Sequence, residues 1–165
     1  MIIKTERLKL SELTIEDAPF ILKLYNDPDF ITYIGDRSIK SVKDAEQFID
    51  LGPRTSYSKY SHGLYLVQLR DGTYVGICGL LKRDNLDYPD IGFAMLPKFR
   101  RKGYTFEAAK ASINDGKMRL GIKTILAITS PKNIASIQLL NKLGMSFKKM
   151  VQMDSNSEFI HLYEV

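Results

Sequence analysis

A strand that passes through a basic, glycine-containing turn directly into a long helix constrains the fold of this chain more than any other feature. The strand is expected over residues 90–96 and stops at Pro97, and the helix over residues 104–120, closed by Gly121. Between them lies the turn Arg100-Arg101-Lys102-Gly103, which lacks the GxxxxGK[ST] spacing of a nucleotide-triphosphate loop. Free N–H groups at the start of the helix, the helix dipole and the added side-chain charge all favour an anion there. The pattern predicts an anion-binding turn in an α/β arrangement, while a solvated basic loop explains the turn alone equally well.

Strand and helix signals alternate in the rest of the chain. Capping boxes at Thr14 and Ser41 predict helix starts, Gly144 predicts a helix end, and Asp71-Gly72 favours a type I′ hairpin turn. The other expected elements are a strand over 3–13, helices over 14–25 and 41–51, a hairpin of strands 64–70 and 73–82, a strand over 123–129, a helix over 133–143 and a last hairpin of strands 147–153 and 159–165. We therefore expect a mixed α/β (α+β) sandwich of sheet and helices.

Composition sets bounds on compartment and partners. With 165 residues, 44% of them hydrophobic, the chain has the size of one domain with a genuine core, and no apolar run reaches the length of a membrane span. A single cysteine, Cys78, excludes an internal disulfide, and the early charge at Lys4 argues against a signal peptide. We expect a cytoplasmic protein. The net charge of +5 suits an anionic ligand and falls short of the clustered charge of a dedicated nucleic-acid binder.

A second group of residues follows the turn by about 30 positions. Asn133-Ile134-Ala135-Ser136 stands at a predicted helix start and Asn141-Lys142-Leu143-Gly144 at its end; taken alone, Asn133 is most simply an N-cap. Together with the basic turn and the opening Thr5-Glu6-Arg7-Leu8, these residues resemble the GNAT superfamily of acyl-CoA N-acyltransferases. More narrowly, the chain resembles the RimJ/RimL branch, which acetylates the N-termini of ribosomal proteins and includes relatives that act on other amines. The resemblance implies one N-acetyltransferase domain over residues 1–165, with a mixed, mostly antiparallel central sheet flanked by helices.

The resemblance also implies an acetyl-CoA site and no metal. Six residues match the pyrophosphate motif of the family and would hold the pyrophosphate with their backbone N–H groups: Arg100, Arg101, Lys102, Gly103, Tyr104 and Thr105. Six more would lie along the rest of the cofactor: Ala94, Met95, Leu96, Asn133, Asn141 and Lys142. The strand residues among them would pair with the pantetheine arm, and Asn133 would hydrogen-bond to it. Thr105 replaces the usual glycine or alanine, so its side chain would either crowd the ligand or add a hydroxyl donor.

Acetyl transfer to an amine requires an oxyanion donor, a base and an acid for the departing thiolate. A strand N–H near Met95 would bind the oxyanion. Asp90 matches the place where relatives often carry glutamate and is the first candidate base, although a solvated strand-end carboxylate is an equally simple reading; Tyr88 is a weaker candidate. Leu140 occupies the position at which many members carry an acidic tyrosine, and Ser136 is the alternative acid.

Other polar and aromatic residues point to structure more than to chemistry. Cys78 lies in an apolar run without a histidine nearby and is expected to be a buried, inert thiol. His62 and His161 are far apart and have no cysteine cluster, which argues against a metal site. Four aromatic residues are expected in the core more than in an acceptor cleft: Phe30, Tyr57, Tyr60 and Tyr65.

The function predicted from the sequence is transfer of an acetyl group from acetyl-CoA to a primary amine, which is a protein N-terminus or a small amine, by direct attack in a ternary complex. One alternative is a non-catalytic acyl-CoA-binding or sensor protein of the same fold, for which the missing tyrosine at Leu140 speaks. Another is a small basic nucleic-acid-binding module, which would need exposed aromatics among its basic residues. No membrane partner is expected, and monomer and homodimer both stay open.

Overall fold

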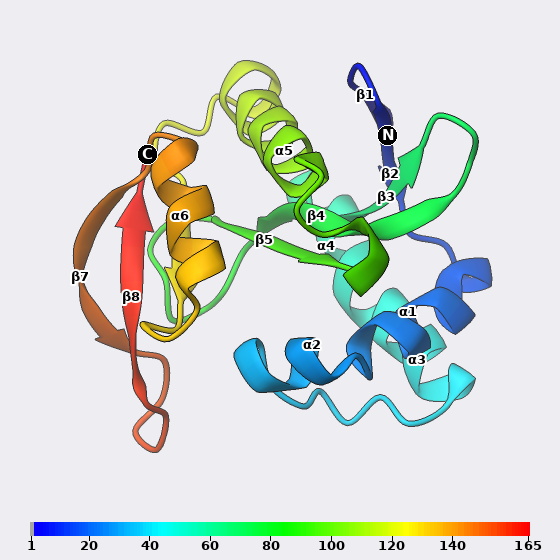
Figure 1. Ribbon diagram of the computed structural model, residues 1–165, viewed down its shortest axis with the longest axis horizontal. Coiled ribbons are helices and arrows are strands. Elements are labelled where there is room, and N and C mark those ends of the chain that lie inside the picture. Colours follow the sequence, from blue (N-terminus) through cyan, green and yellow to red (C-terminus); the bar gives the residue numbers. More distant parts are fainter. Residues whose placement is uncertain (1) are drawn as a thin grey trace.

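An eight-stranded sheet runs through the middle of the protein, with the strands in the order β1-β2-β3-β4-β5-β6-β8-β7 (Figure 1). The structure is a computed structural model that describes residues 2–165. The strands are β1 (Ile2–Lys4), β2 (Leu8–Glu12), β3 (Leu64–Leu69), β4 (Tyr74–Leu81), β5 (Asp90–Met95), β6 (Leu126–Thr129), β7 (Ser146–Gln152) and β8 (Phe159–Glu164). Every neighbouring pair is antiparallel except β5 and β6, which are parallel. The predicted mixed, mostly antiparallel sheet flanked by helices is confirmed.

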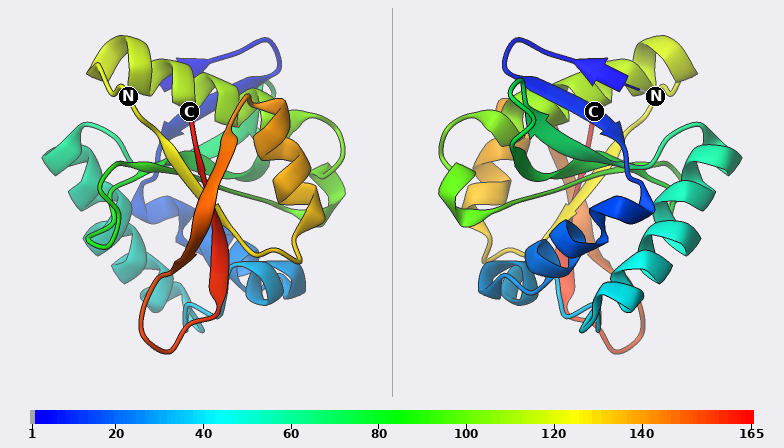
Figure 2. Two further views of the ribbon diagram at one scale, coloured as in Figure 1. Left: turned by 90° about the vertical axis from the view of Figure 1, so that its left-hand side faces the viewer. Right: turned by 90° about the vertical axis from the view of Figure 1, so that its right-hand side faces the viewer.

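Helices cover both faces of the sheet (Figure 2). The α-helices are α1 (Ala18–Tyr25), α2 (Pro28–Tyr33), α3 (Val42–Ile49), α4 (Thr55–Tyr60), α5 (Tyr104–Leu120) and α6 (Ile134–Lys142), and three shorter helical segments are η1 (Ile15–Asp17), η2 (Asp50–Arg54) and η3 (Pro97–Phe99). Helix α5 crosses one face, and α1 to α4 lie on the other. No helix within residues 2–165 combines the length and the apolarity needed to cross a bilayer.

Small residues let α5 pack closely against the sheet. Ala108, Ala109 and Ser112 are buried on its inner side, and Ser112 Oγ lies 3.7 Å from Cys78 Sγ on β4. A Cβ added at Gly116 would come within 2.5 Å of Leu80 Cδ1, so an alanine there would force the buried Leu80 side chain to move. The close packing fixes the start of α5 relative to β5, which precedes it in the chain.

The two parallel strands separate after their first residues. Within the described part of the chain, β5 and β6 share one registered pair, Asp90 with Leu126, next to a hydrogen bond of 2.8 Å from the Leu126 N–H to the Pro89 carbonyl. Beyond this pair the strands diverge toward Met95 and Thr129. We call the space between their diverging ends the β5–β6 gap. Both strands lead into helices at this open end, because α5 follows β5 and α6 follows β6.

Several predicted elements differ in the structure. The strand expected over 3–13 is a hairpin of β1 and β2, closed by the Thr5 N–H donating to the Leu8 carbonyl. The prediction of a type I′ turn at Asp71-Gly72 is wrong. Among residues 2–165, Gly72 has a positive φ of 89° but Asp71 does not, and the Gly72 N–H donates to the Leu69 carbonyl. This is a type I turn followed by a left-handed glycine.

The helical region before β3 is longer than predicted. Both capping boxes form, since the Thr14 N–H donates to Asp17 and the Asp44 N–H to Ser41. Helix α2 was not predicted, because Pro28 stops α1 and also stands at the first position of the next helix. Helix α3 continues through η2 into α4, where a π-helical segment accommodates Pro53.

Candidate functional site

The β5–β6 gap borders an edge of β5 that has no registered pair with β6 beyond Asp90 in the described residues, and Met95 on this edge is 4% exposed. The Leu96 N–H donates to the Val75 carbonyl on β4 at 3.0 Å. Because backbone groups alternate in direction along a strand, Met95 and Phe93 direct theirs away from β4, toward the gap. The Met95 carbonyl accepts a hydrogen bond from Arg100 Nε at 2.9 Å, which leaves the Met95 N–H facing the gap. Of the predicted residues 94–96, Met95 therefore presents its backbone to a ligand in the gap, and Phe93 joins it.

The turn at the open end of this gap has an unusual backbone. Arg101 (φ 59°) and Gly103 (φ 81°) are both in the left-handed region, which disfavours a side-chain-bearing residue such as Arg101. Helix α5 starts at Tyr104, and the first N–H groups of a helix have no acceptor within it. Arg101 and Lys102 are exposed, whereas Tyr104 and Thr105 are half-buried in the first turn. The arrangement presents N–H groups and positive charge together, as an anion site requires.

Arg100 has a different role from the neighbouring basic residues. Its guanidinium donates hydrogen bonds to the carboxylates of Asp27 and Asp29, at the start of α2, in addition to the Met95 carbonyl. Its charge is therefore neutralised within the protein, and its backbone N–H donates to the Pro97 carbonyl at 3.2 Å. The expectation that Arg100 adds free charge to the turn is wrong, because two aspartates more than 70 residues earlier in the chain bind it.

The start of α6 lies at the same end of the two parallel strands. Asn133 is its N-cap, and the side-chain oxygen of Asn133 accepts a hydrogen bond of 3.1 Å from the Ser136 N–H. Ser136 is half-buried in the first turn. Leu140, one turn later, is 1% exposed and packs in the core. At this position α6 therefore offers a buried aliphatic side chain in place of an acidic hydroxyl group.

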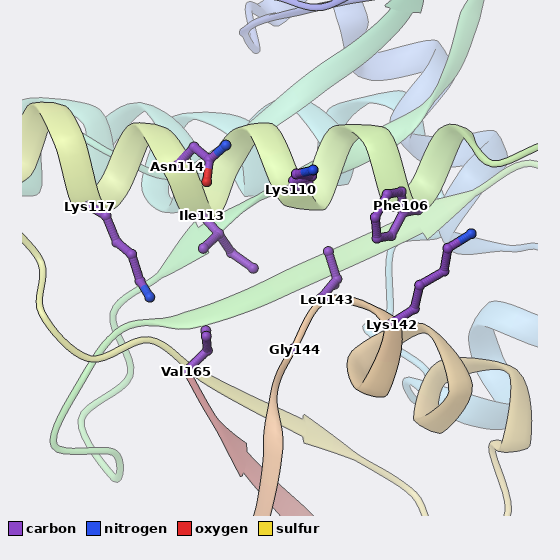
Figure 3. Close-up of a pocket in the computed structure, with 9 residues that line it drawn as sticks. All are labelled: Phe106, Lys110, Ile113, Asn114, Lys117, Lys142, Leu143, Gly144 and Val165. Atoms are coloured by element: carbon purple, nitrogen blue, oxygen red, sulfur yellow. The ribbon is translucent and has the colours of Figure 1, made fainter.

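A groove lies between α5 and the end of α6 (Figure 3). Its volume is about 330 Å³, and Phe106, Lys110, Lys117 and Lys142 are among the residues that line it. Lys142 Nζ lies 4.7 Å from the centroid of the Phe106 ring, and Phe106 follows Gly103 by three residues. Asn141 is exposed beside Lys142. Three lysines give the groove a positive potential that suits a second anionic group.

Asp90 lies where β5 and β6 pair, at the closed end of the gap. Its side chain is 1% exposed, and its Oδ1 accepts a hydrogen bond of 2.8 Å from Arg83 Nε. Burial raises the pKa of Asp90, and the Arg83 charge partly offsets that rise. A raised pKa suits a base, but a buried, ion-paired carboxylate does not reach an acceptor. The geometry favours a structural ion pair that joins the loop before β5 to the sheet. Tyr88, in the same loop, is exposed.

Cys78 and His62 are structural, whereas His161 has a buried Nδ1 without a hydrogen-bond partner among the described residues. Burial raises the pKa of the Cys78 thiol to about 12, so it is not a nucleophile at neutral pH. His62 Nδ1 lies 2.9 Å from the Leu80 carbonyl, and burial lowers the pKa of His62. In the described residues no group of histidine, cysteine and carboxylate side chains gathers as metal ligands. Phe30 and Tyr65 are buried in the core, Tyr57 stacks on Tyr65, and Tyr60 lies at the surface against His62.

Comparison with known proteins gives three findings. A family profile described as an acetyltransferase (GNAT) domain matches residues 7–146. The uncharacterized N-acetyltransferase YnaD of Bacillus subtilis (strain 168) is 28% identical over 156 residues, which cover 92% of this chain and 88% of the relative. Two solved structures share the fold: a GNAT-family acetyltransferase from Bacillus anthracis (TM-score 0.83, 24% identity, covering 100% of this chain and 98% of that one) and RimL, a ribosomal L7/L12 alpha-N-protein acetyltransferase in complex with coenzyme A (TM-score 0.87, 13% identity, covering 100% and 97%).

Proposed function

The chain belongs to the family of acetyltransferase (GNAT) domains, and on that premise we propose that it moves an acetyl group from acetyl-CoA to a primary amine by direct attack in a ternary complex. The observation that carries the proposal is the β5–β6 gap with the basic turn at its open end. Acetyl-CoA has an extended arm with amide groups that is joined to a diphosphate. Backbone groups at a strand edge pair with amides, and N–H groups at a helix start bind phosphate, so the two features fit the two parts of the ligand.

Named residues would hold each part of acetyl-CoA. The backbone of Met95 and Phe93 would pair with the pantetheine arm, and the N–H groups between Arg101 and Thr105 with the diphosphate. Lys110 and Lys142 line the groove between α5 and the end of α6, and we assign the nucleotide end of the ligand to that groove. Bound acetyl-CoA supplies the thioester on which the reaction takes place.

The protein contributes position, one donor and one proton to the transfer. The Met95 N–H faces the gap and would donate to the oxyanion that forms when the amine attacks the thioester. The Ser136 hydroxyl, in the first turn of α6, would give a proton to the departing thiolate, directly or through water. The proton that the attacking amine loses would pass to water and restore the hydroxyl, so that the C–S bond breaks as the C–N bond forms with no net change in protons. Holding amine and thioester together supplies much of the acceleration without further groups.

We propose an α-amino group as the acceptor in preference to a lysine side chain. An α-amine has a pKa of about 7.7–8.0 and a lysine of about 10.4, so a useful fraction of the α-amine is unprotonated at neutral pH. The site supports this choice because its candidate base, Asp90, is buried in an ion pair. The test is a competition between a lysine-free peptide with a free N-terminus and the same peptide with a blocked N-terminus and one internal lysine. Preference for the blocked peptide, or fast turnover of a polyamine with neither peptide used, would contradict the choice.

A non-catalytic acyl-CoA-binding protein is the second candidate, and the buried Leu140 is the observation that favours it. One measurement tests both candidates, and a second separates them. Acetyl-CoA at 100 times its Kd should stabilise the protein by about 2.7 kcal/mol in either case, and a melting temperature that does not move refutes both. Release of free CoA thiol with any member of an amine panel requires the enzyme, and its absence across peptides, polyamines and aminoglycosides supports the binding protein.

A further inference from the structure

The first hairpin of the chain reaches across to the start of α5. Both oxygens of the Glu107 carboxylate are bound by Thr5 and Arg7: the Thr5 hydroxyl (2.5 Å) and the Arg7 N–H (2.8 Å) donate to Oε1, and Arg7 Nε (2.6 Å) donates to Oε2. Glu107 lies in the first turn of α5, a hundred residues away in sequence. We call Thr5, Arg7 and Glu107 the latch.

Arg7 also contacts the anion turn itself. Its Nη1 donates to the Lys102 carbonyl at 2.9 Å, and its guanidinium carbon lies 4.7 Å from the centroid of the Tyr104 ring. A Cβ placed on Gly103 would come within 3.2 Å of Arg7 Nη2. One side chain therefore touches three consecutive residues of the turn.

This contact fixes the direction of a backbone donor. In a planar trans peptide the C=O of one residue and the N–H of the next point in opposite directions. Because Arg7 holds the Lys102 carbonyl on its own side, the Gly103 N–H points away from Arg7. The turn needs such support, since Arg101 and Gly103 are both in the left-handed region and Arg101 bears the energetic cost of a side chain there.

The latch also controls a charge next to the anion site. A free carboxylate in the first turn would repel a phosphate and compete for the same N–H groups. Although partial burial acts to raise it, the hydrogen bonds from Thr5 and Arg7 lower the pKa of Glu107, so the group is an ion whose lone pairs are directed to the hairpin.

We propose that Thr5, Arg7 and Glu107 are positioning residues for the diphosphate of acetyl-CoA: the latch holds the turn 101–104 in the conformation that binds phosphate. The inference rests on the proposed function, because it assumes that acetyl-CoA occupies the turn. It assigns a role to the Thr5-Glu6-Arg7 segment that its position at the start of the chain does not suggest.

For the substitution Glu107→Gln, simple charge attraction and the latch predict opposite changes in the affinity for acetyl-CoA. Removing a negative charge beside the turn should tighten binding of an anion if Coulomb attraction alone operates. The latch predicts the opposite, because the single amide oxygen cannot accept from the Thr5 hydroxyl, the Arg7 N–H and Arg7 Nε at the positions of both carboxylate oxygens. The Arg7 side chain is then released, and the Lys102 carbonyl loses its donor. We expect the Kd of acetyl-CoA to rise about tenfold, the equivalent of about 1.4 kcal/mol. Arg7→Lys should weaken binding to a similar extent, because one ammonium cannot replace the contacts of the guanidinium.

A donor without the diphosphate separates positioning from general damage. S-acetyl-pantetheine lacks that group, so kcat/KM for it should be the same in Glu107→Gln as in the unmutated protein, while kcat/KM for acetyl-CoA falls. The matched control is Asp115→Asn, which removes the charge of Asp115 from its ion pair with Arg119 (2.7 Å), toward the other end of α5. This variant should leave kcat/KM unchanged for both acetyl donors. Unchanged or tighter acetyl-CoA binding in Glu107→Gln, or equal losses with both donors, overturns the inference. Failure of the unmutated protein to bind acetyl-CoA refutes the proposed function instead.

Discussion

Replacing Gly103 by alanine tests whether the anion turn binds the ligand, and Gly121 supplies a matched control. The two glycines flank α5 at its two ends with similar left-handed backbones, φ 81° and 66°. An alanine in this conformation costs about 1 kcal/mol at either position. Each variant should therefore melt about 2–4 °C below the unmutated protein, if it unfolds in a two-state transition.

The surroundings of the two glycines differ. A Cβ at Gly121 has no other heavy atom within 4 Å, whereas a Cβ at Gly103 lies 3.2 Å from Arg7 Nη2. Arg7 can move because that atom ends a flexible side chain, but moving it breaks the bond of 2.9 Å to the Lys102 carbonyl. Loss of one hydrogen bond of about 1 kcal/mol predicts an acetyl-CoA Kd about fivefold higher in Gly103→Ala and unchanged in Gly121→Ala.

Calorimetric titration of acetyl-CoA into both variants, at a temperature well below either melting transition, measures the difference. Repeating the Gly103→Ala titration in an Arg7→Met background shows whether the effect passes through Arg7, since the two changes should then be non-additive. Equal Kd values in the two glycine variants would refute the placement of the ligand at this turn. An undiminished effect in the Arg7→Met background would show that the methyl group meets the ligand directly.

Three further variants probe the chemistry and the groove. Ser136→Ala should lower kcat about tenfold with the acetyl-CoA Kd within a few-fold, because a thiol of pKa about 8.5 leaves tolerably without an acid; lost stability with unchanged turnover would make Ser136 a cap residue. Asp90→Asn should leave turnover per folded molecule within about threefold, against the 10²–10⁴-fold loss expected for a base. Because burial raises the pKa of Asp90, its stabilising contribution is present below the ordinary aspartate pKa of 3.8 and is lost as the pH rises through the folded value. As the pH rises from 3.8 through the pKa of folded Asp90, the unmutated protein should therefore lose stability relative to the Asp90→Asn variant. A difference in melting temperature between the two proteins that does not change with pH contradicts this. The double variant Lys110→Met, Lys142→Met should raise the Kd of acetyl-CoA about fivefold, and it should raise the Kd of an acetyl-CoA that lacks the 3′-phosphate of its nucleotide by a smaller factor. An equal rise in Kd for the two ligands would mean that the 3′-phosphate lies outside the groove.

The sequence by itself determined the local elements around the site. Helix α5 has the predicted bounds, Tyr104–Leu120, and the capping residues at Thr14, Ser41 and Asn133 mark helix starts as expected. These signals act within one or two turns of backbone, so a single stretch of sequence contains all the information they need. The family match over residues 7–146 confirms the resemblance to the GNAT superfamily that the two motifs indicated.

The tertiary structure decided which side chains are free to act. Arg100 belongs to the same basic run as Arg101 and Lys102, yet Asp27 and Asp29 bind it from more than 70 residues away. The resemblance makes Asp90 the first candidate base, but Arg83 and the converging strands bury it.

The β5–β6 gap and the latch likewise exist only in the folded chain. The gap arises because two strands separated by the whole of α5 pair at a single position, and the latch joins residues a hundred positions apart. Contacts of this kind depend on how the sheet brings distant segments together, and no local pattern of residue types specifies them.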